Sequence, residues 1–223
     1  MVGGGMNAVI GILLALHHRG RTGQGQYIDI SMTDGSVSLL PFALFWRHLT
    51  GKAPQRADTM LSHRYACYNT YETADGRHLS IGAVENRFWK NLCDHFGVPE
   101  FTPLQYDDQR RREIIAFFRE RFRTKTLDEW TEVLEPLDVC FGRIQSFDEV
   151  FDDPLFIQRR MVVDLPAADG HPAKALGVPV KLSASPGTVR TPAVAFGANT
   201  RAVLAELGYS PAEMDRLAAE GVI

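Results

Sequence analysis

Apolar residues in the first fifty positions fall into two blocks separated by a short alternating segment. Residues 8–16 are almost all apolar and are followed by Gly20 and Gly23, which predicts a helix that ends near these glycines. Residues 26–31, QYIDIS, alternate polar and apolar side chains as a short strand does, and a second apolar block runs over residues 34–46. The order helix, strand, helix is typical of the end of an α/β domain with a parallel sheet.

The middle of the chain carries the signal of a β-hairpin. Residues 65–73 and 77–83 have the composition of two strands, and Ala74-Asp75-Gly76 lies between them. Asp-Gly suits a tight turn because glycine readily adopts the positive φ that such turns require. We therefore expect an antiparallel pair of strands here.

Apolar spacing of three and four residues predicts helices after the hairpin. The expected ranges are 86–96, 109–123 and 127–134, with Thr126 and Glu129 as a capping box for the last. Residues 178–182 are a candidate strand. Two helices, 199–207 and 211–221, close the chain, the second with Ser210 as its N-cap.

Composition excludes several classes of protein. With 223 residues and 45% hydrophobic content, the chain can bury a core. The net charge is −3 and the basic residues are scattered, so we expect no nucleic-acid partner; the run 110–112, RRR, is expected to lie along a solvated helix face. The three cysteines fit neither a disulfide framework nor a zinc spacing, which predicts no metal site and a cytoplasmic location.

The apolar run 8–16 is not expected to meet a membrane. No basic segment precedes it, histidines follow where small cleavage-site residues belong in a signal peptide, and it is far shorter than the ~20 residues that span a bilayer. We expect a buried helix and no membrane partner.

Four blocks together resemble one enzyme family. They are GGGMNAVIGILLALHHRGRTGQGQYIDISMTDG (residues 3–35), YNTYETADGRHLSIGAVENRFWKNLCDHFGVP (68–99), SFDEVFDDPLFIQRRMV (146–162) and GANTRAVLAELGYSPAEMDRLAAEGVI (197–223). In this order and spacing they resemble the class III, or CaiB/BaiF-type, CoA-transferases, a family that includes the α-methylacyl-CoA racemases. No single block would suffice for the assignment.

The resemblance implies a fold and an assembly. Members have a Rossmann-like α/β large domain built from both chain ends, a smaller α+β domain between them, and interlocked homodimers. Carried over to this chain, residues 1–50 belong to part of the large domain, 51–59 to a linker and 60–185 to the small domain. Residues 186–223 form the return segment and the helices that pack on the large domain.

The resemblance also implies a chemistry. CoA-transferases of this class use an aspartate that attacks a CoA thioester and forms a mixed anhydride, which splits one acyl transfer into covalent steps. The substrates are an acyl-CoA and a carboxylic acid, and no cofactor is expected to be bound. The racemase alternative moves a proton beside the thioester carbonyl and must stabilise an enolate oxygen. Residues 60–71 lack glycine, unlike the glycine-rich loop of the formyl-CoA transferase branch.

The nucleophilic aspartate of relatives aligns one position before Met1. We therefore expect this chain to lack the N-terminal half of the family's protein and to have no acyl-CoA activity in isolation. A third hypothesis follows, in which the chain is an inactive remnant subunit that associates with an intact one.

Five residues are candidates for the site. Glu85 matches the family's Gly-Ala-x-Glu and is the catalytic candidate, although a carboxylate there also suits the N-terminus of a helix. Met32 matches a position that lines the CoA or acyl site, but a methionine there also suits core packing. Gly3, Gly4 and Gly5 either let a thioester approach the backbone or form a flexible start to the first helix.

Overall fold

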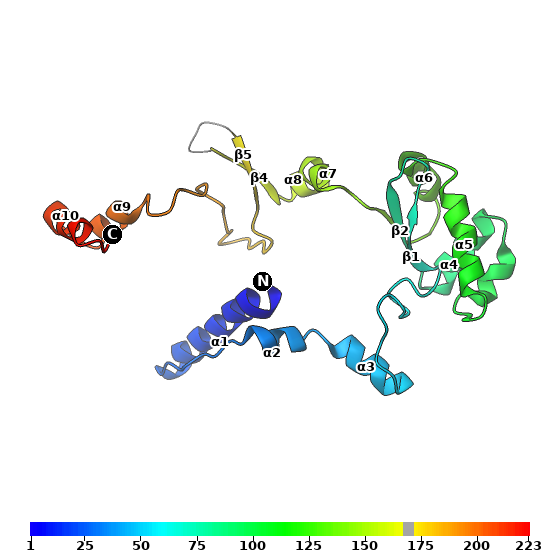
Figure 1. The fold of residues 1–223 in the computed structure, drawn as a ribbon, viewed down its shortest axis with the longest axis horizontal. Coiled ribbons are helices and arrows are strands. Elements are labelled where there is room, and N and C mark those ends of the chain that lie inside the picture. Colours follow the sequence, from blue (N-terminus) through cyan, green and yellow to red (C-terminus); the bar gives the residue numbers. More distant parts are fainter. Residues whose placement is uncertain (167–171) are drawn as a thin grey trace. The chain divides into compact units, whose positions relative to one another are not determined.

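The computed structural model describes residues 1–166 and 172–223, which divide into two units, Met1–Ile144 and Gln145–Ile223. Figure 1 labels the helices and strands. The first unit contains η1 (Val2–Met6), α1 (Asn7–Thr22), α2 (Met32–Val37), α3 (Pro41–Thr50), β1 (Tyr68–Glu72), β2 (His78–Gly82), α4 (Asn86–His95), η2 (Pro99–Leu104), α5 (Arg111–Phe122), α6 (Leu127–Leu134) and β3 (Phe141–Arg143). The second contains α7 (Phe147–Asp152), α8 (Pro154–Gln158), β4 (Val162–Pro166), β5 (Pro172–Leu176), α9 (Thr200–Glu206) and α10 (Pro211–Ala219).

The predicted hairpin is confirmed and forms two strands of a three-stranded antiparallel sheet. Strand β2 lies in the middle, pairing Thr70 of β1 with Ser80 and also pairing Ser80 with Gly142 of β3. Gly76 has φ +74°, and its amide donates to the Thr73 carbonyl at 3.0 Å. The turn therefore uses a single left-handed residue, which glycine adopts at no steric cost.

One face of this sheet is covered by helices and carries the core of the first unit. Strand residues alternate between buried and less buried positions, as the two-residue period of a strand requires. The buried side chains of β1 and β2 meet the apolar faces of α4, α5 and α6 in a cluster rich in aromatic rings. Its fully buried large members are Tyr71, Leu79, Ile81, Trp89, Leu92, Phe118, Phe122, Leu127 and Leu134.

The three predicted helices after the hairpin are confirmed. Helix α6 spans the predicted range, and its capping box forms: the Thr126 side chain accepts from the Glu129 amide, and the Glu129 carboxylate accepts from the Thr126 amide at 2.7 Å. Such reciprocal bonds satisfy amides that the helix leaves unpaired. A local signal of this kind needs no tertiary information.

The second unit contains a second hairpin and four short helices. Strands β4 and β5 pair antiparallel, with Val163 opposite Ala175. Ser146 and Ser210 begin α7 and α10 with capping boxes of the same kind, so the predicted N-cap at Ser210 is confirmed.

Two predicted strands are wrong. Residues 26–31 have no strand partner among the described residues; instead, Ile28 and Ile30 lie against Gly11 of α1, with Ile28 Cγ2 3.1 Å from where a Cβ on Gly11 would stand. Residues 178–182 also form no strand, because β4 pairs with residues 172–176 and Pro179 has no amide to donate. Both described sheets are accordingly antiparallel.

The prediction that residues 8–16 form a buried helix is half correct. The segment is helical and ends next to Gly23, but α1 has no buried residue. Val9, Leu13 and Leu14 are among its exposed apolar side chains, and no described residue covers them.

The domain limits at 51–59 and at 186 stay predictions, and residues 167–171 of the predicted small domain lie outside the described residues. Within the described part of the chain, every helix is too short or too polar to cross a membrane.

Candidate functional site

Glu85 lies between β2 and α4 in the sequence. It is the N-cap residue of α4, with an extended backbone (φ −69°, ψ 135°), and its carbonyl accepts hydrogen bonds from the amides of Phe88 (3.0 Å) and Trp89 (3.2 Å). Its side chain makes no capping bond and is exposed. The backbone of Glu85 is thus fixed while its carboxylate is available to a ligand, which leaves both the catalytic and the helix-terminus interpretations open.

Gln105 and Tyr106 form hydrogen bonds with the two residues before Glu85. The Gln105 amide donates to the carbonyls of Ala83 and Val84, and the Tyr106 hydroxyl donates to the Val84 carbonyl. The sequence interpretation missed both residues, since neither lies in a recognisable motif.

Four of the five candidate residues lie elsewhere, where η1 crosses α2. A Cβ added at Gly35 would lie 2.0 Å from the Gly3 carbonyl oxygen, so the two backbones are in direct contact. Met32 Cγ lies 3.0 Å from where a Cβ on Gly4 would stand, which places the methionine side chain over that glycine. Gly3 and Gly4 therefore have a packing reason to be glycine.

Gly5 differs from its two neighbours because no atom lies within 4 Å of the position that its Cβ would occupy. The Met32 side chain is 74% exposed, so the structure does not bury it as core packing would. An open backbone position and an exposed, polarisable thioether are compatible with contact to a ligand.

A hollow of about 250 Å³ opens on the face of the hairpin turned away from the core. Its lining includes His63, Tyr68, Thr70 and Ser80. His63 has φ +67°, unusual for a residue other than glycine, and its Nε2 lies 3.3 Å from Thr70 Oγ1. From the sequence, His63 beside Arg64 is interpreted either as part of a surface loop or as a contact for a carboxylate or phosphate.

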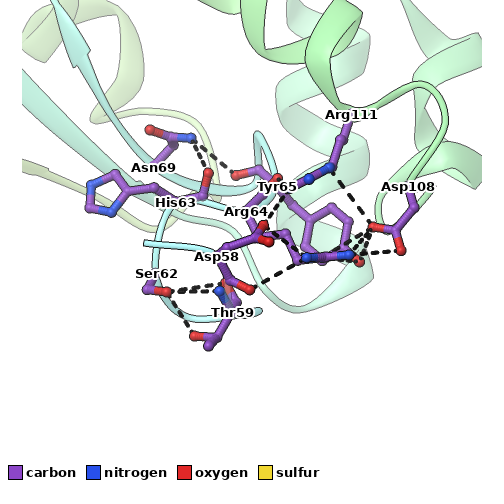
Figure 2. A network of polar contacts seen from close by, with 9 residues as sticks. All are labelled: Asp58, Thr59, Ser62, His63, Arg64, Tyr65, Asn69, Asp108 and Arg111. Atoms are coloured by element: carbon purple, nitrogen blue, oxygen red, sulfur yellow. Dashed lines mark hydrogen bonds and ion pairs between the residues drawn. The ribbon is translucent and has the colours of Figure 1, made fainter. Parts of the chain in front are cut away.

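A polar network joins residues 58–65 to the start of α5 (Figure 2). Arg64 forms a two-pronged bond to Asp108, with Nε donating to Oδ1 at 3.1 Å and Nη2 to Oδ2 at 2.9 Å, and pairs with Asp58 at 2.8 Å. Arg111 Nη1 lies 2.6 Å from Asp58 Oδ1. The prediction of a solvated face for residues 110–112 is therefore wrong at Arg111.

These arginines act on the carboxylates electrostatically. Hydrogen bonding from Arg111 lowers the pKa of Asp58, and hydrogen bonding from Arg64 lowers the pKa of Asp108, because both bonds favour the charged form. Across residues 1–166 and 172–223, no three His, Cys, Asp or Glu side chains gather as metal ligands would.

Comparison with known proteins decides the family. The model of CoA-transferase family III matches residues 1–200. The chain belongs to this family. It is 31% identical over 224 residues to human alpha-methylacyl-CoA racemase, an alignment that covers 99% of this chain and 57% of the racemase.

Relatives that are named as CoA-transferases align with a similar share of this chain. The chain is 30% identical to succinyl-CoA–D-citramalate CoA-transferase of Chloroflexus aurantiacus, covering 97% of this chain and 55% of the relative. A crystal structure of a CAIB/BAIF family protein from Brucella suis superimposes with a TM-score of 0.74 at 25% identity, covering 92% of this chain and 54% of that one. The mixed helix and sheet fold is thus that of family III, and the chain spans little more than half the length of these relatives.

Proposed function

We propose that the protein acts on CoA thioesters and transfers CoA between carboxylic acids through an aspartyl anhydride. The observation that carries the proposal is the placement of Glu85, whose exposed carboxylate follows strand β2 on a hydrogen-bonded turn. An accessible carboxylate on a fixed backbone of this kind suits proton transfer to and from an acyl-CoA or an acceptor acid. No described residue is assigned as the nucleophile.

Gly5 and Met32 are proposed to contact the acyl-CoA. The space beside Gly5 admits a ligand to the backbone, and the exposed Met32 side chain supplies an adaptable apolar surface for an acyl chain. Gly3 and Gly4 then serve the site indirectly, by letting η1 approach α2. The proposed assembly is a homodimer, and CoA enters as substrate rather than as a bound cofactor.

Racemisation of 2-methylacyl-CoA is the second candidate. The human racemase is among the relatives, and Gly82-Ala83-Val84-Glu85 resembles the family's Gly-Ala-x-Glu, whose glutamate assists acid/base work in racemases. Both reactions use the same substrate class, so they differ in whether an acceptor acid is required.

One experiment separates the two. The 223-residue chain and the product of the longest reading frame that contains it are each incubated with a 2-methylacyl-CoA in D₂O, with and without a carboxylic acid. New acyl-CoA formed only with the acid supports transfer, whereas deuterium at the α-carbon without the acid supports racemisation. Turnover of neither kind by the longer product would overturn the proposal and favour a remnant subunit.

The role of Glu85 is tested in whichever form is active. Glu85→Gln is expected to lower kcat about 10²- to 10⁴-fold, the usual contribution of a general acid or base. Glu206→Gln is the matched control, since Glu206 is an exposed glutamate at the end of α9 in the other unit. An unchanged kcat for Glu85→Gln would leave Glu85 with its helix-terminus role alone.

A further inference from the structure

Strand β2 stops forming ladder bonds before the chain reaches Glu85. The pairing with β1 ends at Gly82, opposite Tyr68, so the carbonyls of Ala83 and Val84 have no partner strand. Ala83 is fully buried, and a buried carbonyl without a hydrogen bond costs about 1–3 kcal/mol. Something outside the sheet must therefore satisfy these groups.

The loop between η2 and α5 supplies the missing bonds. Gln105 is buried, and its Nε2 donates to the Ala83 carbonyl at 3.0 Å and to the Val84 carbonyl at 2.8 Å. The Tyr106 hydroxyl donates to the same Val84 carbonyl at 2.8 Å. The carbonyls of both residues before Glu85 thus accept hydrogen bonds from side chains of a loop that is distant in the sequence.

The residue after Glu85 touches the same amide, because Asn86 Nδ2 lies 3.5 Å from Gln105 Oε1. Together with the bonds from Phe88 and Trp89 to the Glu85 carbonyl, these contacts fix the backbone on both sides of Glu85. Only its side chain stays free to rotate.

The surroundings of Tyr106 keep its phenol protonated. Burial raises the pKa of Tyr106 to about 12, and the nearby Cys67 thiol and Glu85 carboxylate add to this effect. The phenol therefore stays protonated and keeps donating to the Val84 carbonyl throughout the neutral range.

The loop that carries these two residues is itself anchored. The Asp107 carboxylate accepts from the amides of Gln109 (2.7 Å) and Arg110 (2.9 Å) at the start of α5. Asp108 accepts from Arg64 and from the Tyr65 hydroxyl in the polar network of Figure 2. The Tyr65 ring meets the Tyr106 ring edge-on, with centroids 5.3 Å apart.

We propose that Gln105 and Tyr106 are positioning residues for Glu85, which fix the turn that directs its carboxylate toward the thioester substrate. The inference rests on the proposed function, since it gives Glu85 its catalytic role. Neither residue is proposed to touch substrate. They act through the backbone, where a displacement of about 1 Å can lower a rate about 100-fold.

A double-mutant cycle tests this. Gln105→Met and Tyr106→Phe remove the donors while keeping the side chains' bulk, and each is expected to lower kcat about 10- to 100-fold with little change in KM. In a Glu85→Gln background, Gln105→Met is expected to have almost no further effect, because the carboxylate it positions is gone. Gln158→Met and Tyr209→Phe, at exposed positions in the other unit, are the matched controls.

The double-mutant cycle distinguishes failure of the proposed function of Glu85 from failure of the positioning role. If Glu85→Gln leaves kcat unchanged, the proposed function of Glu85 fails. The positioning role fails if Glu85→Gln lowers kcat but Gln105→Met leaves kcat unchanged. It also fails if the fold-reductions in kcat caused by Gln105→Met and Glu85→Gln multiply in the double variant.

Hydrogen exchange gives a readout that needs no activity. In the 223-residue chain, Gln105→Met is expected to speed exchange about tenfold at the amides of Phe88 and Trp89, which donate to Glu85, while the core amide of Phe118 keeps its rate. Equal acceleration at all three amides would indicate general destabilisation and overturn the inference, as would no change at Phe88 and Trp89.

Discussion

Arg64 and Asp108 lie 44 positions apart in the sequence and meet in a two-pronged ion pair, in which Arg64 Nε donates to Asp108 Oδ1 at 3.1 Å and Nη2 to Oδ2 at 2.9 Å. Arg64 Nη2 also lies 2.8 Å from Oδ1. The fork of a guanidinium matches the geometry of a carboxylate, so the pair fixes direction as well as distance. It thereby ties residues 58–65 to the loop that supports the turn at Glu85.

Replacing the Arg64 guanidinium with the ammonium group of lysine is expected to weaken this ion pair. Arg64→Lys keeps the charge but cannot make the parallel bonds, and we expect the free energy of unfolding of the first unit to fall by about 1 kcal/mol. Urea unfolding followed by Trp89 and Trp130 fluorescence measures this. Arg110→Lys, in an exposed pair with Glu113 one turn away, is the control and is expected to change nothing measurable. Equal effects of the two variants would contradict the prediction.

The same pair makes stability depend on acidity. Because Arg64 lowers the pKa of Asp108 below its unfolded value of about 3.9, the charged pair stabilises the fold above about pH 4. This contribution is lost as pH falls through the lower, folded pKa. Asp108→Asn is therefore expected to be less stable than the parent at pH 7 and to approach it at pH 3.

Urea titrations at several pH values check the acid prediction. The double variant Arg64→Lys with Asp108→Asn is expected to show the same pH dependence as Asp108→Asn alone, because the group that titrates is already absent. A parent and an Asp108→Asn variant that stay equally far apart from pH 7 to pH 3 would show that the pair does not cause the dependence.

Phe118 is a fully buried aromatic side chain in the core of the first unit. It contacts Trp89 and Phe96, each with ring centroids 5.3 Å away. Phe118→Ala is expected to cost about 3–5 kcal/mol through lost burial and a residual cavity, and Phe118→Leu clearly less. Thermal unfolding measures both. Phe196→Ala is the control, since Phe196 is fully exposed, and a comparable loss there would contradict the assignment.

Gly35 is expected to tolerate no side chain. Its Cβ would overlap the Gly3 carbonyl, so Gly35→Ala should push η1 away from α2, at a cost of about 1–3 kcal/mol. Faster hydrogen exchange confined to residues 2–37 would be the measured sign. Gly5→Ala adds the same methyl group in open space and is expected to leave exchange unchanged.

Local signals explain what the sequence predicted well. Asp75-Gly76 defines the hairpin turn, and the exchange of bonds between Thr126 and Glu129 defines the start of α6; each lies within a few residues of its partner. Residues 26–31 and 178–182 failed because a strand exists only through a neighbouring strand, and alternation alone cannot show whether one is present.

The candidate site was predicted only in part, for a related reason. Glu85, Met32 and the glycine run were found from their resemblance to a family pattern, whereas Gln105 acts on carbonyls 21 and 22 positions away. A glutamine directly after η2 carries no such meaning until the fold shows which carbonyls lack a partner. The separate packing reason for Gly3 and Gly4 likewise depends on contact with α2.

Strand β3 pairs with β2 across a far longer stretch of chain than β1 does, and the Ser80 hydroxyl of β2 donates to the Gly142 carbonyl of β3, 62 positions later. Closing so long a loop costs more entropy than forming the hairpin or the helices in between, so we expect β3 to dock last. A nascent chain emerging from the ribosome would then carry an unpaired β2 edge until residues 141–143 are released. During that interval the exposed edge of β2 can pair with strands of other chains.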